Sequence, residues 1–148
     1  MLIQSNVRMD RAVTRRAIGE ARAAGDALIL LAVLDPAIPE KVAAQFTEAG
    51  HIGPRPSEGF LSSLYERHEQ LALQQADEIV REAKAEGLSV RLVVRRGDYA
   101  TETAQVVKAE KPVTVVIEKR RRSLLRFATG DTFIDGLRKE EGFRLIEI

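Results

Sequence analysis

LSVRLVVRRGDYATETAQVVKAEKPVTVVIE, residues 88–118, is the stretch that decides the fold of this chain. Its first part, Leu88 to Arg95, is rich in β-branched residues, which is typical of a strand. Gly97-Asp98 then ends the run with a turn signal, and Val113 to Ile117 is a second apolar run. The segment between the turn and the second run has the composition of a short helix. Strand, helix and strand in this order predict a βαβ unit, and therefore a parallel sheet that is buried on both faces.

The helix inside this unit has recognisable ends. Asp98 can cap its amino terminus, and Pro112 prevents it from continuing. Its apolar side is predicted to hold Ala100, Ala104 and Val107, which recur at intervals of three and four residues.

The residues before this unit continue the same alternation. A weak first strand is expected within residues 2–9, followed by a helix from its cap Asp10 to about Ala24. Gly25 stands where a left-handed residue usually ends a helix. Ala27 to Leu34 is an uninterrupted apolar run, as expected for a central strand of a parallel sheet.

The remaining segments fit the same scheme. Residues 36–59 read as a long loop that contains a short helix, Val42 to Ala49, and a long helix is predicted from Leu61 to Glu86. At the end of the chain, a helix is predicted from about Thr132 to Glu141 and a strand from Phe143 to Ile148. Such alternation predicts an α/β protein, a three-layer sandwich with a mostly parallel sheet.

Composition narrows the possible classes of function. The 148 residues fit a single domain, 1–148, and a net charge of +1 gives no general attraction to nucleic acid or to anionic membranes. The chain has no cysteine and only two histidines, so disulfides and cysteine-based zinc sites are excluded and no metal site is expected. Residues 1–10 have no apolar core of the signal-peptide type, and we expect a cytoplasmic protein.

The order of elements resembles that of the universal stress protein family, most specifically in residues 26–36 and 88–118. The resemblance implies a five-stranded Rossmann-like or flavodoxin-like sheet and a homodimer formed through the last strand. It also implies two branches. One binds ATP through an Asp at the end of the first strand and a motif G-x-x-G, about nine residues, G-(S/T) after the fourth strand, and the other lacks this motif.

The glycine motif is degenerate in this chain. It falls on residues 118–121, Glu-Lys-Arg-Arg, where both glycines are missing, and its distal end is only partly matched by Gly130-Asp131-Thr132. Glycines let backbone N–H groups approach phosphates with a positive φ, which costs another residue roughly 1–2 kcal/mol. Glu118 would also repel phosphate oxygens by about 4 kcal/mol at ~4 Å and an effective dielectric of ~20. ATP binding in the family's manner is therefore not expected.

The first strand also departs from the family. The family reads V-x-V-D-G-S there, whereas this chain reads IQSNVRMD, residues 3–10. Either Asn6 or Asp10 can stand in the place of the family's Asp, and the spacing leaves both open.

The candidate ligand residues lie at the predicted carboxyl ends of the strands, where ligands bind in open α/β sheets. They are Asn6, Asp10, Val33, Asp35, Lys119, Arg121, Gly130, Asp131 and Thr132. Several have a simpler structural interpretation, because Asp10 and Asp131 are ordinary helix caps and Asp35 begins a turn. The basic run 119–122 also has a simpler interpretation, which is a solvated loop. We interpret His68, on the apolar side of the long helix, as a packed residue, and we find no catalytic set.

The last strand is the predicted dimer interface. It comprises Phe143, Arg144, Leu145, Ile146, Glu147 and Ile148. A short apolar edge strand of this kind can pair with a second copy of itself, with Arg144 and Glu147 bridging the two-fold axis.

Three functions remain open from the sequence. The first is a homodimeric binding or regulatory module of the stress response, without catalysis and without ATP held in the family's manner. The second is a nucleotide-binding protein, with slow ATP hydrolysis not excluded, in which Lys119 and Arg121 replace the glycine loop. The third is an adaptor whose basic run docks an acidic partner or, with less support, a nucleic acid.

Overall fold

The computed structural model describes residues 1–4, 9–49, 56–118, 136–138 and 142–148. Its strands are β1 (Leu2–Gln4), β2 (Leu28–Leu34), β3 (Val90–Arg96), β4 (Thr114–Ile117) and β5 (Arg144–Glu147). Its longer helices are α1 (Arg11–Ala24), α2 (Ala37–Glu48), α3 (Glu58–Ala85) and α4 (Tyr99–Glu110). The strands form one sheet in the order β3-β2-β1-β4-β5, and every adjacent pair is parallel. The predicted α/β class with a five-stranded parallel sheet is confirmed.

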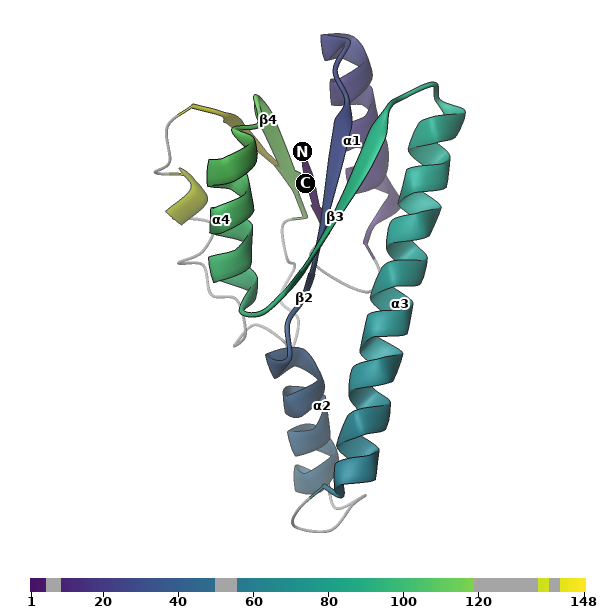
Figure 1. Ribbon diagram of the computed structural model, residues 1–148, viewed down its shortest axis with the longest axis vertical. Helices are drawn as coiled ribbons and strands as arrows, with labels where there is room; N and C mark the ends of the chain where they lie inside the picture. The colour runs from purple at the N-terminus through teal and green to yellow at the C-terminus, as the bar shows by residue number, and fades with distance from the viewer. Residues whose placement is uncertain (5–8, 50–55, 119–135, 139–141) are drawn as a thin grey trace.

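Helices cover both faces of the sheet (Figure 1). On one face, α1 and α3 pack against Leu2 and Leu30, and on the other α4 packs against Ile3 and Leu31. Neighbouring residues of one strand point to opposite faces, and both faces are covered here. This is why Ala27 to Leu34 reads as a continuous apolar run rather than as an alternating one.

The ends of α1 are the predicted ones. The carboxylate of Asp10 accepts a hydrogen bond from the backbone N–H of Ala12 at 2.8 Å. Gly25 ends the helix with φ +68°, in the left-handed region that glycine adopts without steric cost.

The buried side of α4 differs from the prediction. Val107 is buried as predicted, but the other buried residues of this helix are Tyr99, Thr103 and Val106 rather than Ala100 and Ala104. Ala104 is exposed and Ala100 only half-buried. The helix is rotated so that the large ring of Tyr99 and both valines face the sheet, which buries more apolar area than two alanines would. The helix ends at Glu110, before Pro112, as expected.

Two helices begin earlier than predicted. The short helix expected from Val42 starts at Ala37, because the side chain of Asp35 accepts a hydrogen bond from the backbone N–H of Ala37 at 2.9 Å. The long helix expected from Leu61 starts at Glu58, with Ser57 as its cap. Side-chain caps of this kind satisfy N–H groups that have no partner inside the helix.

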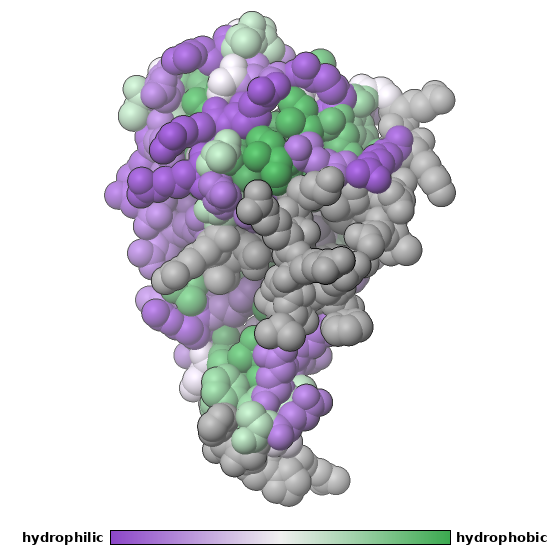
Figure 2. Space-filling model, turned by 180° about the vertical axis from the view of Figure 1, so that it is seen from behind, coloured by the Kyte–Doolittle hydropathy of each residue, from purple (hydrophilic) through white to green (hydrophobic). Residues whose placement is uncertain are grey.

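The first half of α3 runs past the sheet beside α2, so that the two helices form an arm (Figure 1). A helix of 28 residues is about 42 Å long, more than a strand of seven residues can cover. Phe46 and Phe60 meet edge to face on this arm, with ring centroids 5.9 Å apart. Figure 2 shows apolar and polar atoms side by side on the arm, and Phe46 remains 41% exposed.

Two predicted segments are only partly described. The first strand was expected within residues 2–9, and its described part is β1, whereas residues 5–8 lie outside the described residues. Of the predicted helix 132–141, residues 136–138 are helical and the others lie outside the described residues. No helix among the described residues has the length and apolar character needed to cross a membrane.

Candidate functional site

The carboxyl ends of the strands form the candidate ligand face of the molecule. Because all five strands are parallel, their last residues lie along one edge of the sheet. The chain order reverses between β1 and β4, since β1 leads to β2 on one side and pairs with β4 on the other. A crevice opens at such a point in open α/β sheets, and ligands bind there. At this point the structure brings together Asp10, which precedes α1, and Glu118, which follows β4.

Two carboxylates of the chain lie at the amino end of α1, beside this crevice. Asp10 caps the helix with its own carboxylate, as its structural interpretation predicts. The backbone N–H of Asp10 in turn donates to Oε1 of Glu118 at 3.4 Å. A helix amino terminus attracts anions. Here two carboxylates of the chain lie at that helix terminus.

Asp35 is a structural residue rather than an open ligand group. It is 3% exposed, and its two carboxylate oxygens accept hydrogen bonds from the backbone N–H groups of Ala37 (2.9 Å) and Tyr99 (3.1 Å). It therefore joins the end of β2 to the first residues of both α2 and α4. Its interpretation as a turn residue fits these contacts. Val33 is also buried, in the apolar cluster on the α4 face, so its side chain is part of the core.

A pocket of about 340 Å³ lies beside the ends of β2 and β3, against α2 and α3. Its lining includes Leu34, Pro36, Pro39, Tyr65, His68 and Gly97. Sequence reasoning did not find this pocket, because α2, α3 and two strands contribute to it from distant parts of the chain. The signal available beforehand was a single histidine on the apolar side of the long helix.

His68 is half-buried in the wall of this pocket. Burial lowers the pKa of its imidazole, an effect that the nearby Asp35 carboxylate opposes. The ring is therefore neutral near pH 7. Its Nε2 is buried and has no hydrogen-bond partner among the described residues.

Polar contacts join β1 and the residue before the cap of α1 to α3. Gln4 is 4% exposed, and its amide nitrogen donates to the backbone oxygen of Ala72 at 3.0 Å. The backbone N–H of Met9 donates to Oε1 of Gln75 at 2.9 Å. Gln4 of β1 and the backbone of Met9 thus have partners on α3, which sequence reasoning missed.

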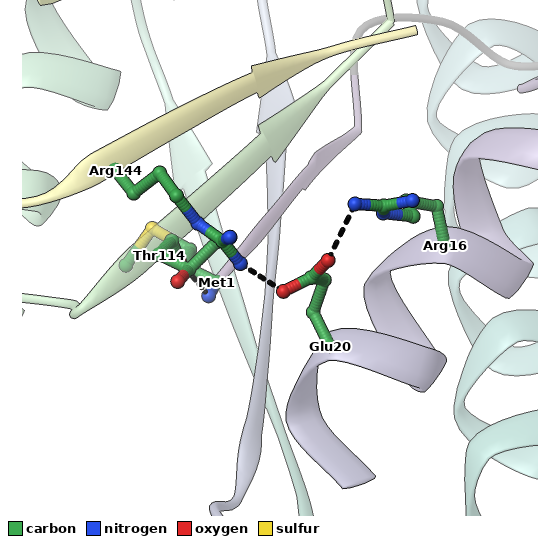
Figure 3. Close-up of polar contacts among 5 residues, drawn as sticks. All are labelled: Met1, Arg16, Glu20, Thr114 and Arg144. Carbon is green, nitrogen blue, oxygen red and sulfur yellow. Dashed lines mark hydrogen bonds and ion pairs between the residues drawn. The ribbon is translucent and has the colours of Figure 1, made fainter. Parts of the chain in front are cut away.

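The charges of the last strand have partners within the chain. Arg144 pairs with Glu20 of α1, which also pairs with Arg16 at 2.8 Å (Figure 3). Glu147 pairs with Arg138 at 2.7 Å. The expected bridge between Arg144 and Glu147 across a two-fold axis would therefore have to displace existing ion pairs.

The apolar side chains of the predicted interface lie partly against the core. Phe143, Leu145 and Ile146 are half-buried against the core clusters, and Ile148 is 37% exposed. No described strand pairs with the outer edge of β5.

Most of the predicted ligand residues lie outside the described residues. These are Asn6, Lys119, Arg121, Gly130, Asp131 and Thr132. Of the predicted set, the structure places Asp10 at the crevice, and Asp35 and Val33 in the buried interior. In the described ranges, no three acidic or histidine side chains gather as metal ligands.

Comparison with known proteins agrees with the fold. The model of the universal stress protein family matches residues 6–134. This range contains β2, β3 and β4 together with α1, α2, α3 and α4. No curated protein matches the chain.

Proposed function

The chain belongs to the universal stress protein family, and we propose that it acts in a stress response as a non-catalytic binding or regulatory module. We propose further that it does not hold ATP in the manner of the family's ATP-binding branch. Family membership supports the role in a stress response. The second part of the proposal depends on the charges beside the crevice.

The observation that carries this proposal is the contact of Glu118 with Asp10. The Glu118 carboxylate lies 3.4 Å from the backbone nitrogen of Asp10, at the helix end where a phosphate would otherwise be attracted. A phosphate oxygen about 4 Å from this carboxylate would be repelled by about 4 kcal/mol at an effective dielectric of ~20. Micromolar affinity corresponds to only about −8 kcal/mol. One such contact is therefore enough to reduce ATP affinity to the millimolar range.

We propose that the module is a homodimer formed through β5. The support is the outer edge of this strand, with which no described strand pairs, and its apolar composition, both of which favour pairing with another strand. A second copy is the partner that fits best, because identical edges meet in a two-fold arrangement.

The proposal is tested by calorimetric titration with Mg-ATP, after mass spectrometry has shown whether a nucleotide co-purifies. We expect no co-purified nucleotide and no binding tighter than millimolar. The double variant Glu118→Gly/Arg121→Gly restores both glycines of the motif and should bind ATP at least tenfold more tightly. Glu118→Gln is the matched control, which removes the charge without the glycine and should gain less.

Two results would contradict this reasoning. Micromolar ATP binding by the unaltered chain would favour the nucleotide-binding alternative, in which Lys119 and Arg121 replace the glycines. No gain in the double variant would show that residues 118–121 do not occupy the position of the glycine motif.

A further inference from the structure

We propose that the pocket beside β2 and β3 binds a small, uncharged ring compound that carries one N–H or O–H group. This proposal names a ligand class for the binding role proposed above and rests on it. The pocket lies between β2 and β3, whereas the nucleotide crevice of the fold lies between β1 and β4. The two sites can therefore be tested separately.

The size and lining of the pocket suit a small apolar molecule. Its volume of about 340 Å³ is near the lower end of the range of roughly 300–1,000 Å³ that is typical of ligand pockets. Leu34, Pro36 and Pro39 form apolar walls, and Tyr65 adds an aromatic ring. Flat rings fit against such side chains with little loss of conformational entropy.

The charged groups of the lining are already paired, and this argues against a charged ligand. Both oxygens of Asp35 accept backbone hydrogen bonds, and Arg96 forms an ion pair with Glu69. The hydroxyl of Tyr65 donates to Oε1 of Glu40 at 2.7 Å. An anion entering the pocket would lose its hydration and face the negative charge of Asp35, whereas a cation would face a carboxylate that is 3% exposed and already hydrogen-bonded through both oxygens.

His68 supplies the polar contact that fixes the ligand class. Its Nε2 is buried without a partner among the described residues, although buried polar atoms in proteins are almost always hydrogen-bonded. The same residue lines the pocket. The χ2 torsion of histidine is soft, so a turn of the ring can bring a nitrogen to a bound molecule. A neutral imidazole nitrogen without a hydrogen accepts a bond from an N–H or O–H group.

Indole is the probe for this site, because it is a flat, uncharged ring with a single N–H. The readout is the ¹⁵N chemical shift of the His68 ring nitrogens, which is simple to assign because the chain has only two histidines. We expect saturable shifts at His68 and none at His51. Benzofuran has the same shape without the N–H and should bind about five- to tenfold more weakly. Indole-3-acetate, which adds a negative charge, should not bind.

Two variants and nuclear Overhauser contacts identify where indole binds. His68→Phe keeps the ring but removes the nitrogen, and should weaken indole binding about tenfold, whereas Arg67→Ala, an exposed neighbour on α3, should leave it unchanged. In the unaltered protein, nuclear Overhauser contacts should join indole to Leu34 and Tyr65, which requires no variant to fold.

Three outcomes would overturn the proposal. They are the absence of His68 shifts up to the solubility limit of indole, equal binding of indole and benzofuran, and tighter binding of indole-3-acetate than of indole. The ATP titration reports on the other crevice. Failure at His68 together with weak ATP binding would therefore refute this inference alone.

Discussion

Replacing Asp35 by alanine should destabilise the protein far more than the loss of an ordinary helix cap. Asp35 is 3% exposed, and its carboxylate accepts one hydrogen bond from the first residue of α2 and another from the first residue of α4. Alanine removes both acceptors at once. Tyr99 is 3% exposed. In the variant its backbone N–H loses the acceptor that Asp35 provides at the end of β2.

The magnitude follows from these two contacts. Leaving a buried donor such as the Tyr99 N–H without a partner costs about 1–3 kcal/mol. Losing the side-chain acceptor at the start of α2 costs about 1 kcal/mol more. The sum is about 3 kcal/mol. For a chain of 148 residues this lowers the melting temperature by roughly 6–12 °C.

Urea denaturation followed by circular dichroism measures this difference, with Asp98→Ala as the matched control. Asp98 also caps a helix, through the backbone N–H of Thr101 at 2.8 Å, but it is exposed. Its loss should cost about 1 kcal/mol, as is typical of a surface cap. Equal destabilisation by the two variants would refute the role assigned to the buried contacts of Asp35.

Two further predictions concern His68 and β5. Burial lowers the pKa of His68 in the folded protein. Below a pH of about 6.5 the unfolded chain therefore binds a proton at this residue more readily than the folded chain does. The free energy of unfolding should fall as the pH is lowered from about 6.5 to the pKa of His68 in the folded protein. Urea denaturation at several pH values should show a smaller fall for His68→Phe, and equal falls would contradict the assignment. In β5 the N–H groups of Arg144 and Ile148 bond to the β4 side, so that of Glu147 points to the outer edge. Glu147→Pro should therefore shift the dimer to monomer in sedimentation velocity while Glu147→Gln leaves it intact, and a dimeric proline variant would place the interface elsewhere.

The features that were predicted correctly from the sequence are those set by neighbouring residues. The βαβ unit of residues 88–118 is encoded by a β-branched run, a Gly-Asp turn and a proline, all within one segment. Asp10 and Asp98 cap the helices that follow them, and Gly25 ends α1 in the left-handed conformation. Such signals act over a few residues and need no knowledge of the rest of the fold.

The features that were missed depend on contacts between distant segments. The rotation of α4 about its axis is set by the packing of Tyr99 and two valines on the sheet. The spacing of the alanines in the helix sequence does not show this rotation. The start of α2 depends on the side chain of Asp35. The sequence identified Asp35 as a turn residue but did not predict its second contact, with the backbone N–H of Tyr99. The candidate ligand residues between 119 and 132 lie outside the described residues, so a role of the basic run in ligand binding stays a prediction.

The sequence by itself determined the α/β class and the alternation of elements, because both are written in local patterns of hydrophobicity and turn residues. Only the tertiary structure decided what the polar groups do. It placed Glu118 beside the backbone of Asp10, both oxygens of Asp35 on two helices, and His68 in the wall of a pocket. A hydrogen bond forms between groups within about 3 Å of each other whatever their distance along the chain. Its partners are therefore known only once the helices have packed on the sheet.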